Sequence, residues 1–171
     1  MHILVVGGGM GGTILANNLA RRLSGELEQG SSKITMLSAS DKHMYQPGLL
    51  YVAVGKMSTS ELYRDQKSLL EPSIDFHVDP VEKFDLDNNN VTTKSGKKIS
   101  YDIICIATGS RGNAAGIPGL AENACQFYTE ADALAMYKKL QKFEGGKVVV
   151  ATGVPHKCPM SPLEITFFLI D

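Results

Sequence analysis

The sequence has 171 residues, enough for one ordinary domain with a sizeable core and part of a second. It carries 17 Lys and Arg against 18 Asp and Glu, so it lacks the basic excess that drives binding to phosphate backbones, and we expect no nucleic-acid partner. The 3 cysteines are an odd number at irregular spacing with no signal peptide, which disfavours a disulfide framework and predicts a cytoplasmic protein. No apolar run approaches the ~20 residues of a membrane span.

The N-terminal segment predicts a βαβ unit. Residues 2–6 form a short β-branched apolar run that stops at glycines, which is typical of a buried parallel strand. From Gly11, apolar residues recur near every fourth position as far as Leu23 and predict a helix. Residues 33–38 predict the second parallel strand, because a helix of this length is the crossover that two parallel strands require.

The middle of the chain predicts a helix and then a β-meander. We expect helix near residues 60–70, with Thr59 or Ser60 as its cap. The apolar run over residues 101–109 predicts another buried strand of the parallel sheet. Short alternating runs separated by turn-forming residues predict the meander, over residues 75–79, 80–86, 90–94 and 98–100.

The last third predicts a linker at residues 112–119, a helix over 130–143 and a strand over 147–152. Ser161 is a predicted cap, with Pro162 at the first helical position and Glu164 three residues after the cap, so a second helix is expected to start at Pro162. Because no βαβ unit naturally stops after one strand and one helix, we expect this sequence to be part of a longer protein.

A glycine-rich turn is the strongest motif in the sequence. Gly7, Gly9 and Gly12 match G-x-G-x-x-G between a predicted strand and a predicted helix, with Met10 and Gly11 completing the segment. The first glycine allows the tight turn, the second lets the backbone approach a pyrophosphate, and the third permits close helix packing. The free N–H groups and dipole of the helix attract phosphates. A glycine-rich turn without a ligand is the alternative, and the strand and helix context favours the dinucleotide.

The same motif expects an acidic residue about twenty positions on, at the end of the second strand, to hold a ribose hydroxyl. Ser38 stands at that place and is the candidate cofactor contact there. Asp41 lies three residues later and could take the role from the loop, or it could be a surface residue that caps a turn. Both interpretations of Asp41 stay open.

Three pieces of the chain, in matching order, resemble one family. They are the turn over residues 7–12, the loop at 45–47 with residues 52–55, and the segment 101–110. Together they resemble the glutathione-reductase-type, FAD-dependent pyridine nucleotide-disulfide oxidoreductases, and within them the sulfide:quinone oxidoreductases and type II NADH dehydrogenases. The resemblance implies that Pro47 approaches the flavin and that the FAD site is lined by Ala107, Thr108 and Gly109. An ordinary loop proline and a strand terminus are the alternatives.

The implied fold is α/β, with a Rossmann-type FAD-binding domain of parallel sheet and β-meander and the start of a second Rossmann-like domain. We expect the FAD-binding domain over residues 1–115, a linker and helix over 116–145, and the truncated second domain over 146–171. We predict no metal site.

The branch of the family depends on the second unit. An NADH-using member needs another glycine turn there, whereas residues 151–159 offer only Gly153 and a proline that lacks an N–H. The same segment holds Cys158, and residues 158–164 resemble the sulfide:quinone oxidoreductase segment in which a redox cysteine lies six residues before a glutamate.

Local chemistry favours a reactive thiol at Cys158. It lies just before the predicted helix N-terminus and beside His156 and Lys157, all of which favour a thiolate. A buried structural or chance surface cysteine is the alternative. Glu164 also has two open interpretations. Its presence is accounted for by helix capping, and a role in proton transfer is an equal alternative.

The other two cysteines differ. Cys105 lies within an apolar strand and is expected to be a small core residue. Cys125 lies three residues before Tyr128, which stands where some sulfide:quinone oxidoreductases carry a flavin-linking cysteine. Covalent attachment, polysulfide handling and no role all stay open for Cys125.

The implied function is oxidation of sulfide, or another small sulfur nucleophile, through a disulfide that includes Cys158 and through FAD to quinone. By resemblance, the partner cysteine, the quinone pocket and helices in peripheral contact with the inner face of the membrane belong to a C-terminal half, so this part alone is expected to be inactive. The alternatives are an NAD(P)H-dependent flavoprotein dehydrogenase and a non-catalytic dinucleotide-binding or redox-sensing module.

Overall fold

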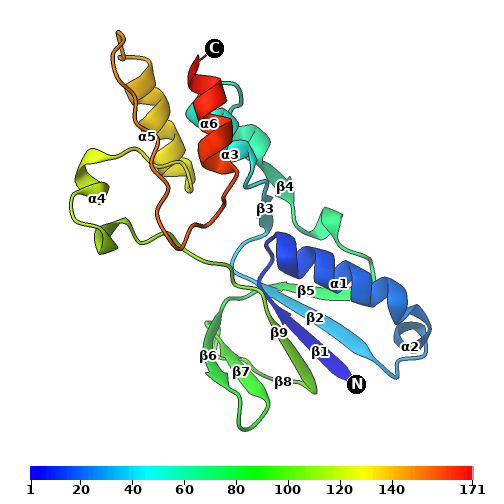
Figure 1. Ribbon diagram of the computed structural model, residues 1–171. Coiled ribbons are helices and arrows are strands. Elements are labelled where there is room, and N and C mark those ends of the chain that lie inside the picture. Colours follow the sequence, from blue (N-terminus) through cyan, green and yellow to red (C-terminus); the bar gives the residue numbers. More distant parts are fainter. Residues whose placement is uncertain (171) are drawn as a thin grey trace. The chain divides into compact units, whose positions relative to one another are not determined.

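The computed structural model describes residues 1–170 and divides into two compact units. The first unit contains residues 1–44 and 64–109, and the second contains residues 45–63 and those from 110 onward. Each unit thus joins segments that are distant in the sequence (Figure 1).

A parallel four-stranded sheet is the centre of the first unit. Its strands lie in the order β5-β2-β1-β9. Val6, at the end of β1, pairs with Leu37 on one side and Ile106 on the other, so these strands end at the same edge. The bounds are β1 His2–Val6, β2 Lys33–Ser38, β5 Ile74–Val78 and β9 Ile103–Ile106.

Two other layers cover the faces of this sheet. Helix α1 (Met10–Arg22), followed by the short α2 (Ser24–Glu28), packs on one face, where Ala16 and Ala20 meet Ile3, Val5, Ile34 and Met36. The opposite face packs against a three-stranded antiparallel sheet through Leu4, Val6, Leu37, Val91 and Tyr101. That sheet is formed by β6 (Val81–Asp85), β7 (Asn90–Thr93) and β8 (Lys98–Ser100) (Figure 1).

The expected α/β class and Rossmann-type sheet with a meander are confirmed, with two corrections. The strand expected to be buried within residues 101–109 is β9, which lies at the edge of the parallel sheet and leaves Ile103 and Ile106 46 and 54 % exposed. The segment expected as the first meander strand is β5, which pairs in parallel with β2 instead. Ile74 and Phe76 of this strand pack on the α1 face of the sheet. Alternation of apolar and polar residues shows that a strand has two unlike faces, but it does not identify the sheet to which the strand belongs.

The second unit is mainly helical. Its buried hydrophobic residues are Leu49, Leu50, Val52, Ala53, Leu62, Ala133, Met136 and Ile165. The helices are α3 (Gly48–Ala53), α4 (Leu120–Asn123), α5 (Glu130–Leu140) and α6 (Ser161–Ile170), with the 3₁₀ turns η1 (Thr59–Leu62) and η3 (Ala114–Gly116).

The helix expected near residues 60–70 is wrong. The chain forms η1, then β4 (Tyr63–Asp65) and η2 (Lys67–Leu69), and β4 pairs with β3 (Lys42–Met44) in a two-stranded sheet. The cap also shifts by one residue, because Ser58 and Glu61 form a capping box at η1. Strand pairing with β3 outweighs the local helical preference here.

The expected helix over 130–143 is confirmed as α5, which ends at Leu140 and is capped by Thr129, whose hydroxyl accepts the Asp132 N–H at 3.2 Å. The strand expected over 147–152 is not formed. Val148, Val149 and Val150 are 50, 76 and 40 % exposed. A strand requires a hydrogen-bonded neighbour, and residues 1–170 offer none to this segment.

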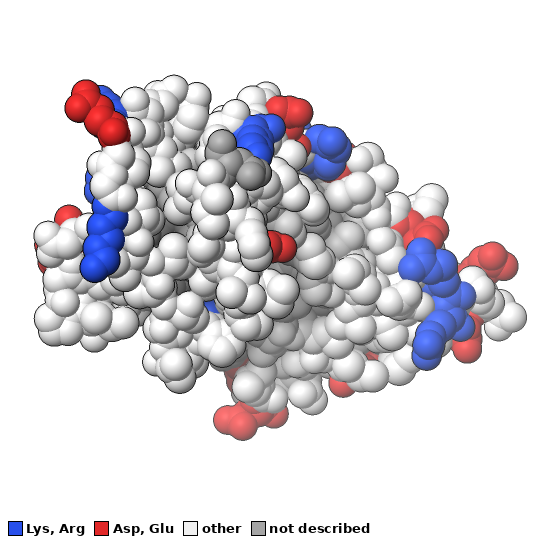
Figure 2. Space-filling view, turned by 45° about the horizontal axis from the view of Figure 1, so that its top comes forward, with Lys and Arg blue, Asp and Glu red and all other residues white. Residues whose placement is uncertain are grey.

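None of the helices within residues 1–170 has both the length and the hydropathy that crossing a membrane requires. On the face drawn in Figure 2, basic and acidic side chains form small groups of both signs, and most of that face is uncharged.

Candidate functional site

The glycine turn leaves β1 at the carboxyl edge of the parallel sheet, where ligands of such sheets bind. Gly7 donates its N–H to the Leu37 carbonyl at 2.8 Å and has a φ of +115°. A Cβ at Gly7 would lie 2.2 Å from the carbonyl oxygen of Ala107. Both the left-handed backbone and the close approach of the segment after β9 therefore require glycine.

Gly12 closes the other side of the turn. A Cβ there would lie 1.9 Å from the carbonyl oxygen of Gly7, so the first turn of α1 packs directly on the backbone that precedes it. This contact fits the role expected of the third glycine of the motif, which is to permit close packing of the helix.

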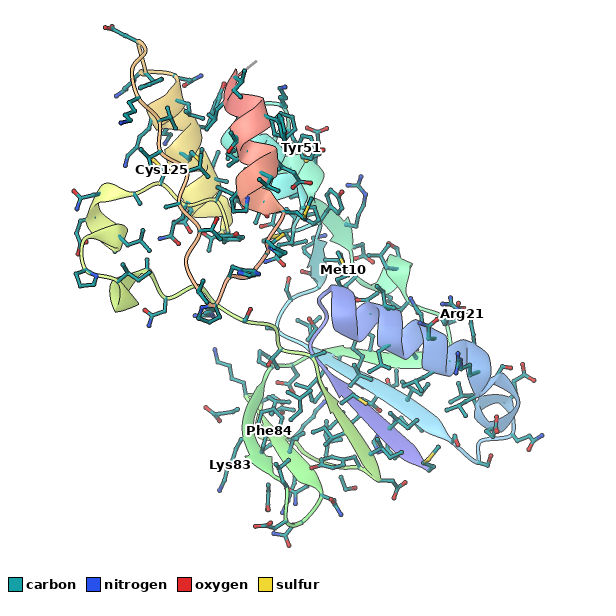
Figure 3. The ribbon with its side chains drawn as sticks, viewed as in Figure 1. Met10, Arg21, Tyr51, Lys83, Phe84 and Cys125 are labelled. Atoms are coloured by element: carbon teal, nitrogen blue, oxygen red, sulfur yellow. The ribbon has the colours of Figure 1, made fainter. Side chains whose placement is uncertain are left out.

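Gly9 and Gly11 instead face open space, with no heavy atom within 4 Å of an added Cβ. Gly9 is the N-cap of the 13-residue helix α1, and no side chain caps this end or adds an acidic group to its first turn. Met10, labelled in Figure 3, is 48 % exposed. Helix N–H groups that are open to a ligand, beside glycines that a ligand can approach, fit the pyrophosphate of a dinucleotide such as FAD.

The segment after β9 lies beside this turn. Ala107 donates its N–H to the Val6 carbonyl at 2.7 Å, which continues the sheet pairing for one residue. Thr108 and Gly109 follow and are exposed, and Gly109 has a φ of +76°. The structure therefore brings Ala107 to Gly109 and the glycine turn to one edge of the sheet.

Ser38 ends β2 and lies under the turn rather than in the open. It is 6 % exposed, its Oγ accepts the Ser40 N–H at 3.2 Å, and a Cβ at Gly8 would lie 2.5 Å from that oxygen. Gly8, which the motif leaves unspecified, thus has to be small. Contact between Ser38 and a ribose stays a prediction. The Asp41 side chain is exposed.

A buried polar network under the turn was not predicted from the sequence. It joins Gln66, which is fully buried, to Thr13, His43 and the carbonyl of Gly8. Gln66 lies in a polar stretch of the segment expected to be helical, and no feature of that stretch signals its burial.

Pro47 belongs to the second unit, where it precedes α3 and is exposed. Its approach to the flavin stays a prediction.

Cys158 lies at the N-terminus of α6 in the second unit. Hydrogen bonds from the Ser161 hydroxyl, and then from the N–H groups of Ser161 and Met160, lower the pKa of the Cys158 thiol below its ordinary value. Partial burial and the negative charge of Glu164 act in the opposite direction. A lowered pKa makes the thiolate more accessible than in an unperturbed cysteine, and a redox role for Cys158 stays a prediction.

The expected causes of this shift need correction. Lys157 is not among the groups that shift the thiol, and its Nζ instead donates to the Ser110 carbonyl at 3.2 Å and lies 5.8 Å from the centre of the Tyr128 ring. His156 is exposed and is likewise not among the groups that shift the thiol. The donors come from the helix start itself, because the chain folds Cys158 back onto the first residues of α6.

The expected capping box of this helix is also wrong. The Glu164 N–H donates to the Met160 carbonyl at 3.0 Å, whereas a capping box would pair it with the Ser161 hydroxyl. The Ser161 hydroxyl donates to Cys158 instead, and α6 begins at Ser161. The charge of Glu164 acts on the thiol by raising its pKa.

All three cysteines are free thiols. Cys105 is half-buried and packs against the core on the α1 face of the sheet, in line with a packing role. Cys125, labelled in Figure 3, is exposed on the segment between α4 and α5.

Comparison with known proteins agrees with these features. The family model described as pyridine nucleotide-disulphide oxidoreductase matches residues 1–153. The sulfide-quinone reductase of Aquifex aeolicus is 37% identical over 152 residues, which cover 87% of this chain and 34% of that protein. The mitochondrial sulfide:quinone oxidoreductase of Mus musculus is 30% identical over 172 residues, which cover 97% of this chain and 37% of that protein.

Among solved structures, the sulfide:quinone oxidoreductase of Aquifex aeolicus superposes with a TM-score of 0.68 and 33% identity, over 82% of this chain and 32% of that one. The chain thus spans about a third of the length of the relatives it matches. The family model covers the glycine turn and the segment after β9 together. The chain belongs to the pyridine nucleotide-disulphide oxidoreductase family, whose members are FAD-binding oxidoreductases.

Proposed function

We propose that this chain is part of a flavoenzyme that oxidises sulfide, or another small sulfur nucleophile, and passes the electrons to quinone. The observation that carries the proposal is the thiol of Cys158, which three hydrogen-bond donors at the start of α6 hold toward its thiolate form. The chain belongs to a redox family, and the relatives named above are called sulfide-quinone reductase and sulfide:quinone oxidoreductase.

In this proposal the first unit binds FAD. The N–H groups at the start of α1 receive the pyrophosphate, Gly9 and Gly11 leave room for it, and Ala107, Thr108 and Gly109 border the site. Ser38 is a further proposed contact in this unit. Contact of Pro47 with the flavin is proposed from the resemblance alone, because Pro47 belongs to the second unit. Bound FAD supplies the two-electron acceptor between the sulfur site and the quinone.

Cys158 takes part in a disulfide with a cysteine outside the residues described here. The sulfur nucleophile attacks the partner sulfur, so that a new S–S bond forms as a persulfide while the original S–S bond breaks and Cys158 leaves as a thiolate. The nucleophile is oxidised and the disulfide is reduced. The donors from Ser161 and Met160 speed this step because a thiol of lower pKa is the better leaving group.

We assign Glu164 the task of accepting or returning a proton beside this thiol. Its charge already raises the pKa of Cys158, which places the carboxylate close enough for the two groups to influence each other. Because quinones are lipid-soluble, we also propose that segments outside this chain make peripheral contact with the inner face of the membrane.

The thiol is also the reason to prefer this function over NAD(P)H oxidation. In an NAD(P)H site, a glycine turn would leave the start of the second helix open to a pyrophosphate. Here the N–H groups of Met160 and Ser161 donate hydrogen bonds to the Cys158 sulfur instead of being open to a pyrophosphate.

The test is Cys158→Ser in the full-length protein, with Cys105→Ser as the matched control. The first variant should keep FAD and lose sulfide-dependent quinone reduction by on the order of a hundredfold or more, because a hydroxyl forms neither a disulfide nor a persulfide. The control should lose about 1–3 kcal/mol of stability if its hydroxyl lacks a partner, and keep its turnover. Near-normal turnover of the Cys158 variant at matched flavin content would exclude the disulfide route.

A further inference from the structure

We propose that Gln66, His43 and Thr13 are positioning residues for the cofactor. They fix the direction of the Gly8–Gly9 peptide, so that the N–H of Gly9 points to the side from which the pyrophosphate approaches. The inference rests on FAD binding by the first unit and is independent of the sulfur chemistry proposed above.

The first branch of the network runs through Thr13. Gln66 Nε2 donates to Thr13 Oγ1 at 2.9 Å, and Thr13 Oγ1 donates in turn to the Gly8 carbonyl at 3.3 Å. Gln66 has no exposed surface and Thr13 is 7 % exposed. Buried polar groups of this kind destabilise a fold unless they are hydrogen-bonded, so the position of each partner is constrained by the others.

The second branch runs through His43. Its Nδ1 lies 3.0 Å from Gln66 Oε1 and 3.1 Å from the Gly8 carbonyl oxygen. A backbone carbonyl oxygen and a side-chain amide oxygen can only accept hydrogen bonds. Nδ1 therefore carries the hydrogen and donates to both oxygens, which also fixes the orientation of the Gln66 amide with its nitrogen toward Thr13. The two branches meet at Gly8, whose carbonyl receives two donors.

The consequence for the turn follows from peptide geometry. In a planar trans peptide the C=O and the following N–H point in opposite directions. Because the Gly8 carbonyl is held toward the network, the Gly9 N–H points away from it. The side chain that Gly9 lacks would project into empty space, and Gly9 is the N-cap of α1. The network thus pre-organises a donor that a phosphate would otherwise have to orient on binding.

Gly8 has to be small for the same arrangement to exist. A Cβ at this position would meet Ser38 Oγ at 2.5 Å and Gln66 Cδ at 3.5 Å. The side chains that support the turn therefore occupy the space below Gly8. Position 8 thus requires glycine, although the G-x-G-x-x-G pattern leaves that position unspecified.

The experiment measures FAD affinity and stability separately. Full-length apoprotein is titrated with FAD by flavin fluorescence, and the unfolding free energy of the same apoprotein is measured in urea. Gln66→Met keeps the length of the side chain and removes its hydrogen bonds, and His43→Phe keeps a ring and removes the donor. Both variants should raise the Kd for FAD by about tenfold, which corresponds to about 1.4 kcal/mol.

Two further variants separate positioning from stability. His43→Asn places an N–H at the position of Nδ1 and should restore most of the affinity that His43→Phe loses. Val91→Ala truncates a fully buried residue on the opposite face of the sheet, away from Gly8, and should lower stability with less than a twofold change in the Kd.

An unchanged Kd in both Gln66→Met and His43→Phe would overturn the proposal. The proposal would also be overturned if Val91→Ala, at the same unfolding free energy as Gln66→Met and His43→Phe, lost as much FAD affinity as they do. A Kd for His43→Asn no lower than that of His43→Phe would overturn it as well. If the wild-type apoprotein takes up no FAD, FAD binding itself is refuted together with this inference. Absence of sulfide oxidation in a protein that binds FAD refutes only the proposed function.

Discussion

At the scale of single residues, the reactivity of Cys158 is set by opposing neighbours. The Ser161 hydroxyl stabilises the thiolate and lowers the thiol pKa, whereas the Glu164 carboxylate raises it. Ser161→Ala should therefore move the pH midpoint of Cys158 alkylation upward, toward the value of about 8.5 of a free thiol. Glu164→Gln should move it downward.

The measurement is the rate of iodoacetamide labelling against pH, with Cys105 and Cys125 replaced so that only one thiol reports. Shifts of the same sign in the two variants would contradict this account of the site.

Gly9 offers a second test at this scale, because it borders open space whereas Gly7 and Gly12 are packed against backbone. Gly9→Val should leave the apoprotein folded, since a Cβ at this position meets no heavy atom within 4 Å, and should abolish most FAD uptake by occupying the space of the pyrophosphate. Flavin absorbance per protein, with circular dichroism as the check on folding, gives the answer. Full flavin content in a folded Gly9→Val protein would place the cofactor elsewhere.

At the scale of elements, the N-terminus of α1 is left without the features that usually stabilise a helix start. It has no capping side chain and no acidic residue in the first turn. An acidic residue there would interact favourably with the helix dipole, by about 0.3–1 kcal/mol at an exposed site. The absence of these features suits an end whose N–H groups serve a ligand.

Met10→Glu tests this property, because it should raise the stability of the apoprotein and lower its affinity for FAD. Because Met10 is half-exposed in the first turn, the carboxylate should raise the stability of the apoprotein by about 0.3–1 kcal/mol. The same charge should weaken FAD binding by repelling the pyrophosphate, and raising the salt concentration should reduce both effects. Urea unfolding and FAD titration measure them, with Met10→Gln as the uncharged control. Tighter FAD binding in Met10→Glu would rule out this helix end as the phosphate site.

At the scale of the whole molecule, the two units carry different chemistry. The first unit offers an open helix N-terminus with five glycines at the turn, whereas at the helix start of the second unit a thiol accepts the N–H groups. We therefore expect sulfide to reduce the flavin of the full-length protein much faster than NADH or NADPH does. Stopped-flow bleaching of the flavin absorbance compares the donors at equal concentration. Rapid reduction by NADH with none by sulfide would reassign the protein to nicotinamide oxidation.

The sequence alone determined the features that local geometry controls. The strand before Gly7 and the helix after it, as well as the meander strands from Val81 to Ser100, were predicted because periodicity and turn residues act within a few positions. The glycine turn was predicted for the same reason, since its φ values and close contacts belong to a short continuous segment.

Only the tertiary structure decided the features that depend on distant partners. It placed β5 in the parallel sheet, buried Gln66 under the turn and left residues 147–152 without a strand partner. It also showed that the donors to Cys158 come from the start of α6 rather than from His156 and Lys157. Pairing, burial and hydrogen bonding join residues that are far apart or folded back on one another, and no local pattern encodes which partner each of them meets.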